Sequence, residues 1–238
     1  MKNISTVSDL HMFCRRSEAE GHMEGIYQAA NEADIFVLNG DTFDFRWSTH
    51  QNTEDTVEAA VAWLRDLTEH AKNTDIRFVL GNHDHVQAFI DKLKVLVEEK
   101  ENLQWHPYYY KYGNAMFLHG DVANKKMTAK DLENYRSSWL HHEQQGEFIN
   151  KVYDLAFKAG VHKVVNKVAF PTEVIVDRVR HYLDDIGEGE GSDTTHVYYG
   201  HTHVAVDDYE YKGQRFYNSG APMPGIPFNI IKTKTKAI

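Results

Sequence analysis

Cysteine is almost absent from this sequence, because the 238 residues include only Cys14. One thiol excludes an internal disulfide framework and a zinc site made of several thiolates. Long apolar runs are absent too, and none reaches the roughly 18 residues that a membrane-spanning helix needs. Residues 1–6 lack the basic start, apolar stretch and small-residue cleavage site of a signal peptide. These absences lead us to expect a soluble protein of the cytoplasm.

Basic residues are in the minority, with 26 Lys and Arg against 35 Asp and Glu, and the formal net charge is −9. A chain this acidic repels the nucleic-acid backbone, so we expect no nucleic-acid partner. The chain has no internal repeat and no long low-complexity linker. Its length and its 42% of hydrophobic residues suit one large α/β domain, or a domain with a sizeable insertion.

Strand and helix patterns alternate in the first half of the chain. Short apolar stretches predict strands that are buried on both faces, and apolar residues at helical spacing predict helices between them. Asn52 or Thr53 can cap the second of these helices. The expected order is strand 4–7, helix 17–31, strand 35–38, a helix from 52 or 53, strand 77–80 and helix 86–99. This alternation predicts a largely parallel inner sheet covered by helices.

Hairpins and a block of helices are expected in the second half. The pairs Gly113-Asn114 and Lys212-Gly213 mark two turns, and the tail 232–236 is either an edge strand or a frayed end. The expected elements are hairpins 108–119 and 209–217, strands 196–199 and 204–206, and helices 128–145, 147–159 and 172–186. Helices between two strand-rich parts indicate a core of residues 1–121 and 192–238, with a helical cap or lid inserted over 122–191.

Five short blocks that carry Asp, His or Asn directly follow predicted strands, and four of them also contain Gly. They are Asp9-Leu10-His11, Gly40-Asp41, Gly81-Asn82-His83-Asp84, His119-Gly120-Asp121 and Gly200-His201-Thr202-His203. Ligands of open α/β sheets bind beyond the carboxyl ends of the strands, so we expect the blocks to converge on one rim. In an extended chain residues i and i+2 point to the same side, which would let Asp9 and His11 bind one cation together. His201 and His203 can do the same, or diverge to two adjacent cations.

The blocks offer seven candidate metal ligands, which are carboxylates, imidazoles and one amide oxygen. They are Asp9, His11, Asp41, Asn82, His119, His201 and His203. Such a set, without a thiolate, suits Mn²⁺, Fe²⁺ or Fe³⁺, or Zn²⁺. Seven groups exceed the needs of one tetrahedral ion and suit two ions that share a carboxylate. We therefore expect a cofactor of two divalent metal ions.

The blocks SDLH, GDTFD, GNHD, HGD and GHTH stand in the order found in the calcineurin-like metallophosphoesterase superfamily, which this sequence resembles. The resemblance implies a four-layer αββα sandwich of the α/β class (α+β in detail). It also implies a hydrolase in which a hydroxide bridging two metals cleaves a phosphoester or pyrophosphate bond. The expected partner is a phosphorylated substrate, either a small molecule or a nucleotide-linked one.

The resemblance also assigns roles to individual residues. Asp9, His11 and His203 would hold the first metal, and Asn82, His119 and His201 the second, with Asp41 bridging both. His83 would face the leaving oxygen as the general acid, or would stabilise the charge growing there, and Asp84 would orient and charge His83.

A closer resemblance concerns the substrate. The GDTFDF block, the predicted helical insertion after HGD and the chain length look like UDP-2,3-diacylglucosamine hydrolases, which cleave a nucleotide-sugar pyrophosphate. Those enzymes carry Arg where this sequence has His83, and GNHD is instead typical of phosphomonoesterases, protein phosphatases and phosphodiesterases. Serine/threonine protein phosphatase, phosphodiesterase and nucleotide-sugar pyrophosphatase activities therefore stay open as alternatives.

Several other residues have two interpretations. The basic residues Lys125, Lys126, Lys130 and Arg136 follow His119 and could hold an anionic part of a substrate, or could line a solvated helix face. Asp44 and Asp121 could each orient a ligand or cap a turn. Peripheral contact of the predicted cap with a membrane is compatible with the sequence, which says nothing about the oligomeric state.

Overall fold

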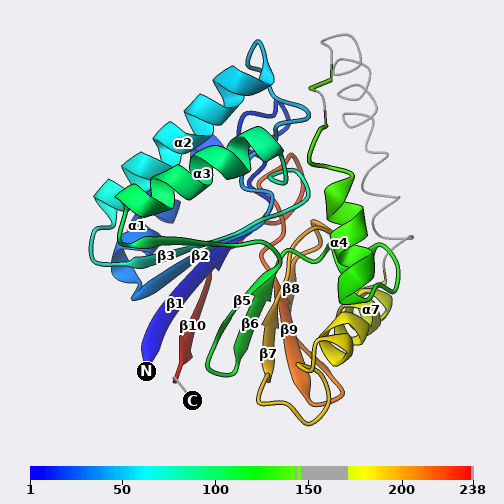
Figure 1. Cartoon of the computed structure of the whole chain (residues 1–238). Helices are drawn as coiled ribbons and strands as arrows, with labels where there is room; N and C mark the ends of the chain where they lie inside the picture. The colour runs from blue at the N-terminus through cyan, green and yellow to red at the C-terminus, as the bar shows by residue number, and fades with distance from the viewer. Residues whose placement is uncertain (143, 146–170, 237–238) are drawn as a thin grey trace.

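The computed structural model describes residues 1–142, 144–145 and 171–236. Two five-stranded sheets pack face to face, and helices cover the outer face of each, so the chain forms four layers in the order αββα (Figure 1). The predicted fold class is confirmed. No helix among the described residues has both the length and the apolar character needed to cross a bilayer.

The first sheet has the order β10-β1-β2-β3-β4. The strands β1, β2, β3 and β4 are parallel, with β4 at one edge, and β10 pairs antiparallel with β1 at the other edge. The helices that cover it are α1 (Met23–Glu32), α2 (Thr53–His70) and α3 (Gln87–Glu99), preceded by the 3-10 helix η1 (Ala19–His22). The strands are β1 (Lys2–Val7), β2 (Ile35–Asn39), β3 (Asp75–Val79), β4 (Leu103–His106) and β10 (Ile231–Thr235).

The second sheet has the order β5-β6-β7-β9-β8. Three inner strands are parallel, and β5 and β8 pair antiparallel at the two edges. Its outer face carries α4 (Ala129–Ser137) and α7 (Thr172–Asp185), with the 3-10 helix η2 (Asp121–Ala123) next to them. The strands are β5 (Tyr109–Tyr112), β6 (Ala115–Leu118), β7 (His196–Tyr198), β8 (Val206–Tyr211) and β9 (Gln214–Asn218).

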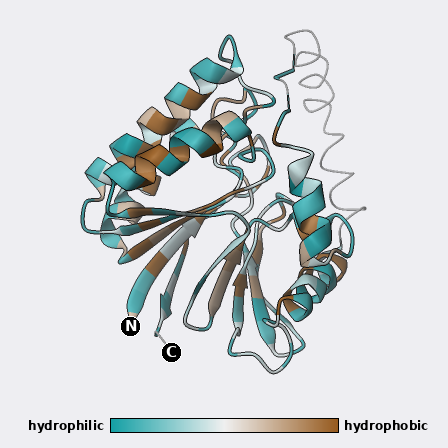
Figure 2. Cartoon of the chain, viewed as in Figure 1, coloured by the Kyte–Doolittle hydropathy of each residue, from teal (hydrophilic) through white to brown (hydrophobic). Residues whose placement is uncertain are grey.

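Three hydrophobic clusters fill the three spaces between the layers. Successive residues of β2 face opposite ways, so Phe36 packs under the helices α1, α2 and α3 while Ile35 and Val37 pack between the sheets. Phe117 and Tyr198 meet β2 from the second sheet. The third cluster joins α4 and α7 to the second sheet. Figure 2 shows hydrophobic residues concentrated along the strands, whereas the helices alternate between hydrophobic and hydrophilic positions.

Most predicted elements are confirmed, including the cap of α2, where the Asp55 N–H donates to Asn52 Oδ1 over 2.8 Å. The tail is an edge strand, β10, which is one of its two interpretations. The sequence analysis missed β4, because only its first residue, Leu103, is buried and the strand has no apolar run. The helix expected at 128–145 ends at Ser137.

The segment 122–191 was expected to form a cap. Its described helices, α4 and α7, pack against the second sheet as that sheet's outer layer. Residues 143 and 146–170, with the helix expected at 147–159, lie outside the described residues. The division of the chain into a core and a cap therefore stays a prediction.

Candidate metal centre

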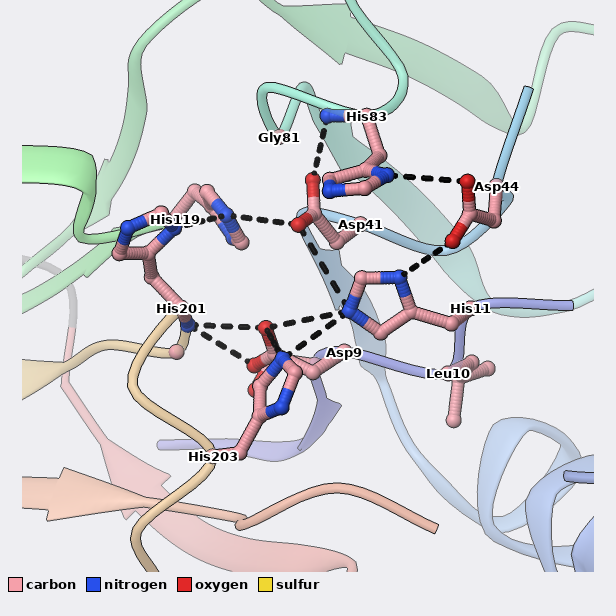
Figure 3. A network of polar contacts seen from close by, with 12 residues as sticks. Asp9, Leu10, His11, Asp41, Asp44, Gly81, His83, His119, His201 and His203 are labelled. Carbon is pink, nitrogen blue, oxygen red and sulfur yellow. Dashed lines mark hydrogen bonds and ion pairs between the residues drawn. The ribbon is translucent and has the colours of Figure 1, made fainter. Parts of the chain in front are cut away.

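The five polar blocks meet at one edge of the two sheets, beyond the ends of β1, β2, β3, β6 and β7 (Figure 3). Among the described residues, His and Asp side chains form three groups in which one potential metal-ligand atom of each residue lies within 4.8 Å of those of the other members. These groups are Asp9-His11-His203, His11-Asp41-His83 and Asp41-His119-His201. The predicted convergence on one rim is confirmed, although the residues are spread from position 9 to position 203.

The first potential ion site lies between Asp9, His11, His203 and Asp41. His11 Nε2 is 3.0 Å from His203 Nε2 and 3.7 Å from Asp41 Oδ2. His203 Nε2 is 3.4 Å from Asp9 Oδ1. The Asp9 carboxylate also accepts the backbone N–H of His201 at 2.9 and 3.0 Å, which fixes the loop after β7 against the end of β1.

The second potential ion site lies around Nε2 of the buried His119. This nitrogen is 3.2 Å from each of three other candidate ligand atoms, which are Asp41 Oδ2, Asn82 Oδ1 and His201 Nδ1. Asp41 Oδ2 therefore borders both sites. His201 and His203 diverge to different sites, which is the second of the two arrangements expected for them.

These spacings fit divalent metal ions. An ion held at about 2.0–2.1 Å by His and carboxylate ligands brings neighbouring ligand atoms to about 3.0–3.4 Å from each other. Five of the observed separations fall in that range, whereas His11 Nε2 lies farther from Asp41 Oδ2 (3.7 Å) and from Asp9 Oδ1 (4.0 Å). Asp9 and Asp41 are 0% and 2% exposed, and buried carboxylates need compensating positive charge. Two cations that share Asp41 would supply this charge.

The backbone is strained at the candidate ligands. Five of the seven have positive φ although they are not glycine: Asp9 (55°), His11 (44°), Asp41 (49°), His201 (67°) and His203 (55°). Such conformations cost of order 1–3 kcal/mol each and cluster at functional sites. The expectation that Asp9 and His11 converge through an extended backbone is wrong, because left-handed residues turn them to the same ion site.

Three glycines make room for the ligands. A Cβ on Gly40 would overlap the His119 ring, one on Gly81 would overlap the Asp41 carboxylate, and one on Gly200 would overlap the Asp9 carboxylate. The ligand side chains thus occupy the space that a larger residue would need. This explains why Gly directly precedes a candidate ligand in three of the five blocks.

Asp44 holds two imidazoles in place. Its Oδ1 accepts from His83 Nδ1 over 3.0 Å, and its Oδ2 lies 3.3 Å from His11 Nδ1. Burial alone would lower the pKa of His83, but the charges of Asp44 and Asp41 outweigh burial and raise the pKa to about 9. Although burial opposes it, contact with these two imidazoles keeps the pKa of Asp44 far below its ordinary value. Asp44 therefore orients these imidazoles, and it also caps the local turn by accepting the N–H of Trp47 over 2.8 Å, so both of its interpretations hold.

Asp84 has a different role from the expected one. Its buried carboxylate accepts three backbone N–H groups, from Thr42 (3.2 Å), Phe43 (2.9 Å) and Gly81 (3.0 Å). Burial, followed by the charge of Asp41, raises the pKa of Asp84 to about 7. The prediction that Asp84 orients His83 is wrong, because its oxygens tie together the turns after β2 and β3.

Arg136 is not placed to bind a substrate. Its side chain is 1% exposed, and its guanidinium pairs with both oxygens of Asp121 and donates to the carbonyls of Leu80 (2.9 Å) and Gly81 (2.7 Å). The expected substrate contact is therefore wrong for Arg136. Its position soon after His119 in the sequence does not show that its side chain is buried. Asp121 is its ion-pair partner.

The three candidate lysines lie on the surface. Lys126 pairs with Asp177 at 2.9 Å, Lys130 pairs with Glu133 at 2.8 Å, and Lys125 is exposed. Their contact with a substrate stays a prediction. The sequence analysis missed Asn124, whose Oδ1 lies 3.0 Å from His201 Nε2. Asn124 follows the HGD block by three residues, and only the turn through η2 brings it to the site.

The comparison with protein families agrees with this geometry. A family model described as calcineurin-like phosphoesterase matches residues 3–205. No curated protein matches the sequence. Among solved structures, 28 chains match. One is a dimetal phosphatase from Danio rerio, with 11% identity and a TM-score of 0.46 over 93% of this chain and 88% of that chain.

Proposed function

This chain belongs to the calcineurin-like phosphoesterase family and is therefore a metal-dependent phosphoesterase, and we propose that it hydrolyses a phosphoester or pyrophosphate bond in a small or nucleotide-linked molecule with two divalent ions. One observation carries the proposal. Asp41 Oδ2 lies 3.7 Å from His11 Nε2 and 3.2 Å from His119 Nε2, so one carboxylate can serve two neighbouring ions.

The proposed ligands follow from the two ion sites. Asp9, His11 and His203 would hold one ion, Asn82, His119 and His201 would hold the other, and Asp41 would serve both. When bound, two such ions lower the pKa of a water molecule and stabilise negative charge on the phosphoryl oxygens. The residues of the chain fix the positions at which this chemistry takes place.

His83 is the proposed proton donor to the leaving oxygen. The Asp44 carboxylate can only accept, so the proton on His83 Nδ1 points to it and Nε2 is the nitrogen left for the substrate. The His83 backbone N–H donates to Asp41 Oδ1 over 2.8 Å, which keeps the ring beside the shared carboxylate. A neighbouring imidazole that donates this proton typically contributes about 10²–10⁴-fold to a rate.

The test is a substrate panel assayed with Mn²⁺, with Zn²⁺ and with chelator. The panel contains p-nitrophenyl phosphate, its bis ester, a phosphoserine peptide and a UDP-diacylglucosamine, and so separates the alternative substrate classes. We expect chelator to abolish turnover, and Asp41→Asn to lower kcat/KM by about a hundredfold or more. Asp66→Asn, which alters an exposed carboxylate bonded to Tyr27, is the matched control. Full activity of Asp41→Asn, or of chelated enzyme, would refute the proposal.

A further inference from the structure

Arg46, which has no carboxylate partner among the described residues, lies one aromatic ring away from the proposed proton donor His83. The ring of Trp139 packs against the ring of His83, with centroids 5.2 Å apart. The guanidinium carbon of Arg46 lies over this indole at 5.5 Å and over that of Trp47 at 5.4 Å. The Trp139 ring therefore contacts the proposed proton donor and, through a cation–π contact, the positively charged guanidinium of Arg46.

The charge of Arg46 is not neutralised by the described residues. Its Nη1 donates to His142 Nε2 over 3.3 Å, and since Arg only donates, His142 accepts as a neutral imidazole. Its Nε is buried and has no hydrogen-bond partner. No carboxylate of the described residues forms an ion pair with Arg46, although the chain has 35 acidic residues. Nearby Asp44 is occupied by His83 and His11.

Aromatic contacts leave this arginine able to bind an anion. Indole rings attract a guanidinium but carry no charge, and the five N–H donors lie in the plane of the guanidinium, where they suit carboxylate or phosphate oxygens. Arg46 is part-buried, so it has lost water, and no described residue supplies a counter-ion in return. A negatively charged group on a ligand would restore that balance.

The segments around Arg46 and Trp139 are held in place by hydrogen bonds to backbone carbonyls. The N–H of Gln145 donates to the carbonyl of Arg46 over 2.8 Å, and Gln144 Nε2 donates to the carbonyls of Ser48 and His50 at 3.1 and 2.7 Å. The Gln87 N–H donates to the Leu140 carbonyl over 3.0 Å. Trp139 and Arg46 are therefore positioned before any substrate arrives, which reduces the ordering cost of binding.

We propose that Arg46 and Trp139 form a subsite for the leaving group, and that it selects substrates whose leaving group carries its own negative charge, a carboxylate or a second phosphate. This inference rests on the proposed function, since it needs the scissile phosphate at the ion sites and the leaving oxygen at His83. The body of the leaving group packs on the Trp139 ring, and its anionic end meets Arg46. Both residues determine specificity, and neither reaches the scissile bond.

A matched pair of substrates tests the subsite. One is 4-carboxyphenyl phosphate, and the other is its uncharged carboxamide of almost the same shape. The ratio of their kcat/KM values in wild type, divided by the same ratio in Arg46→Gln, cancels the intrinsic difference between the two leaving groups. Since a hydrogen-bonded charge is lost, we expect this preference for the carboxylate to fall about tenfold or more in Arg46→Gln. An unchanged ratio would overturn the inference.

Controls separate charge, folding and catalysis. Arg65→Gln removes an arginine of α2 that pairs with Glu99 at 2.7 Å, and it should leave the ratio as in wild type. Arg46→Lys retains the charge and should keep part of the preference. Thermal unfolding of each variant shows whether the fold is intact.

A binding measurement separates this inference from the proposed function. Calorimetry of Mn²⁺-loaded protein with 4-carboxybenzylphosphonate and its carboxamide needs no turnover. Preferential binding of the carboxylate that disappears in Arg46→Gln supports the subsite, whereas equal affinities, or no binding of either compound, overturn it. If both aryl phosphates are hydrolysed and Arg46→Gln does not change the ratio of their kcat/KM values, the subsite is refuted but the proposed phosphoesterase activity is not. If the wild-type enzyme hydrolyses no substrate of the panel described above, the proposed phosphoesterase activity itself is refuted.

Discussion

Among single residues, Asp44 has the clearest function outside the set of candidate ligands. Both of its oxygens face imidazoles, and its Oδ1 also accepts the N–H of Trp47 over 2.8 Å. Asp44→Asn keeps the shape but removes the charge that holds the proton on His83 Nδ1. We expect kcat to fall by about 10²-fold with the fold retained, because removing the orienting carboxylate of a catalytic imidazole disturbs its tautomer.

The measurement for Asp44→Asn is kcat together with metal content and thermal unfolding, beside Asp66→Asn as the control. Wild-type kcat in a fully metal-loaded variant would show that His83 needs no carboxylate. If kcat falls only because metal is lost, Asp44 acts by orienting the candidate ligand His11 and not by orienting His83.

A second prediction at this scale concerns Gly81. A methyl group there would overlap the Asp41 carboxylate, so Gly81→Ala must move either the shared ligand or the turn that carries Asn82. We expect metal binding to weaken by about 10–100-fold, as for other changes that misplace a ligand. Gly21→Ala is the matched control, because no atom lies within 4 Å of the added carbon. The measurement is a metal titration of both variants. Equal metal affinities would contradict the close contact between Gly81 and the Asp41 carboxylate.

Residues of this kind mark the limit of what the sequence predicts. The seven candidate ligands could be identified because each lies beside a recognisable strand end. The choice between Asp44 and Asp84 as the partner of His83 could not be made, because it depends on the path of two turns. The left-handed backbone at Asp9 and Asp41 could not be predicted from the sequence either. Even Asp adopts such conformations in a small minority of cases, and here the surrounding structure imposes them.

At the scale of elements, helix α4 holds two ligand-bearing loops together. Its residue Arg136 pairs with Asp121, just after the β6 loop that carries His119, and donates to the carbonyls of Leu80 and Gly81 at the end of β3. Arg136→Met leaves the Asp121 carboxylate buried without its partner. Because a broken buried pair costs about 3–5 kcal/mol, we expect urea unfolding to show a loss of that size.

The pH dependence of that loss is a further check. Burial alone would raise the pKa of Asp121, but Arg136 and then His119 lower it to about 2. A carboxyl whose pKa is lower in the folded state stabilises the fold above its unfolded pKa of about 3.9 and loses this effect as the pH falls toward 2. The gap between wild type and Arg136→Met should therefore be full near neutral pH and narrow below about pH 4. A gap that is constant over this range would show that the ion pair is not its cause.

The elements also show which parts of the fold can be foreseen. The alternation from β1 to α3 has strong apolar patterns, and the two hairpins have turn pairs at their centres. The strand β4 lacks an apolar run, and the packing of α4 and α7 against the second sheet depends on contacts across the whole chain. The split into two sheets follows from which strands pair, and neither apolar periodicity nor turn residues encode that choice.

At the scale of the whole molecule, the two-sheet architecture creates the site. β1, β2 and β3 bring Asp9, Asp41 and Asn82 from the first sheet, while β6 and β7 bring His119 and His201 from the second. The cluster of Ile4, Val37, Phe117 and Tyr198 between the sheets sets their separation. The shared carboxylate therefore lies where the sheets meet, and neither sheet alone carries both ion sites.

The most direct test of this account is low-temperature electron paramagnetic resonance of protein loaded with Mn²⁺, with metal content measured on the same sample. Two ions that share Asp41 would lie roughly 3.5–4 Å apart, so we predict two Mn²⁺ per chain and a spectrum of exchange-coupled spins, replaced in Asp41→Asn by isolated ions or fewer of them. A wild-type protein that binds one Mn²⁺, or two that give only the signal of isolated ions, would contradict the shared centre on which the proposed function rests.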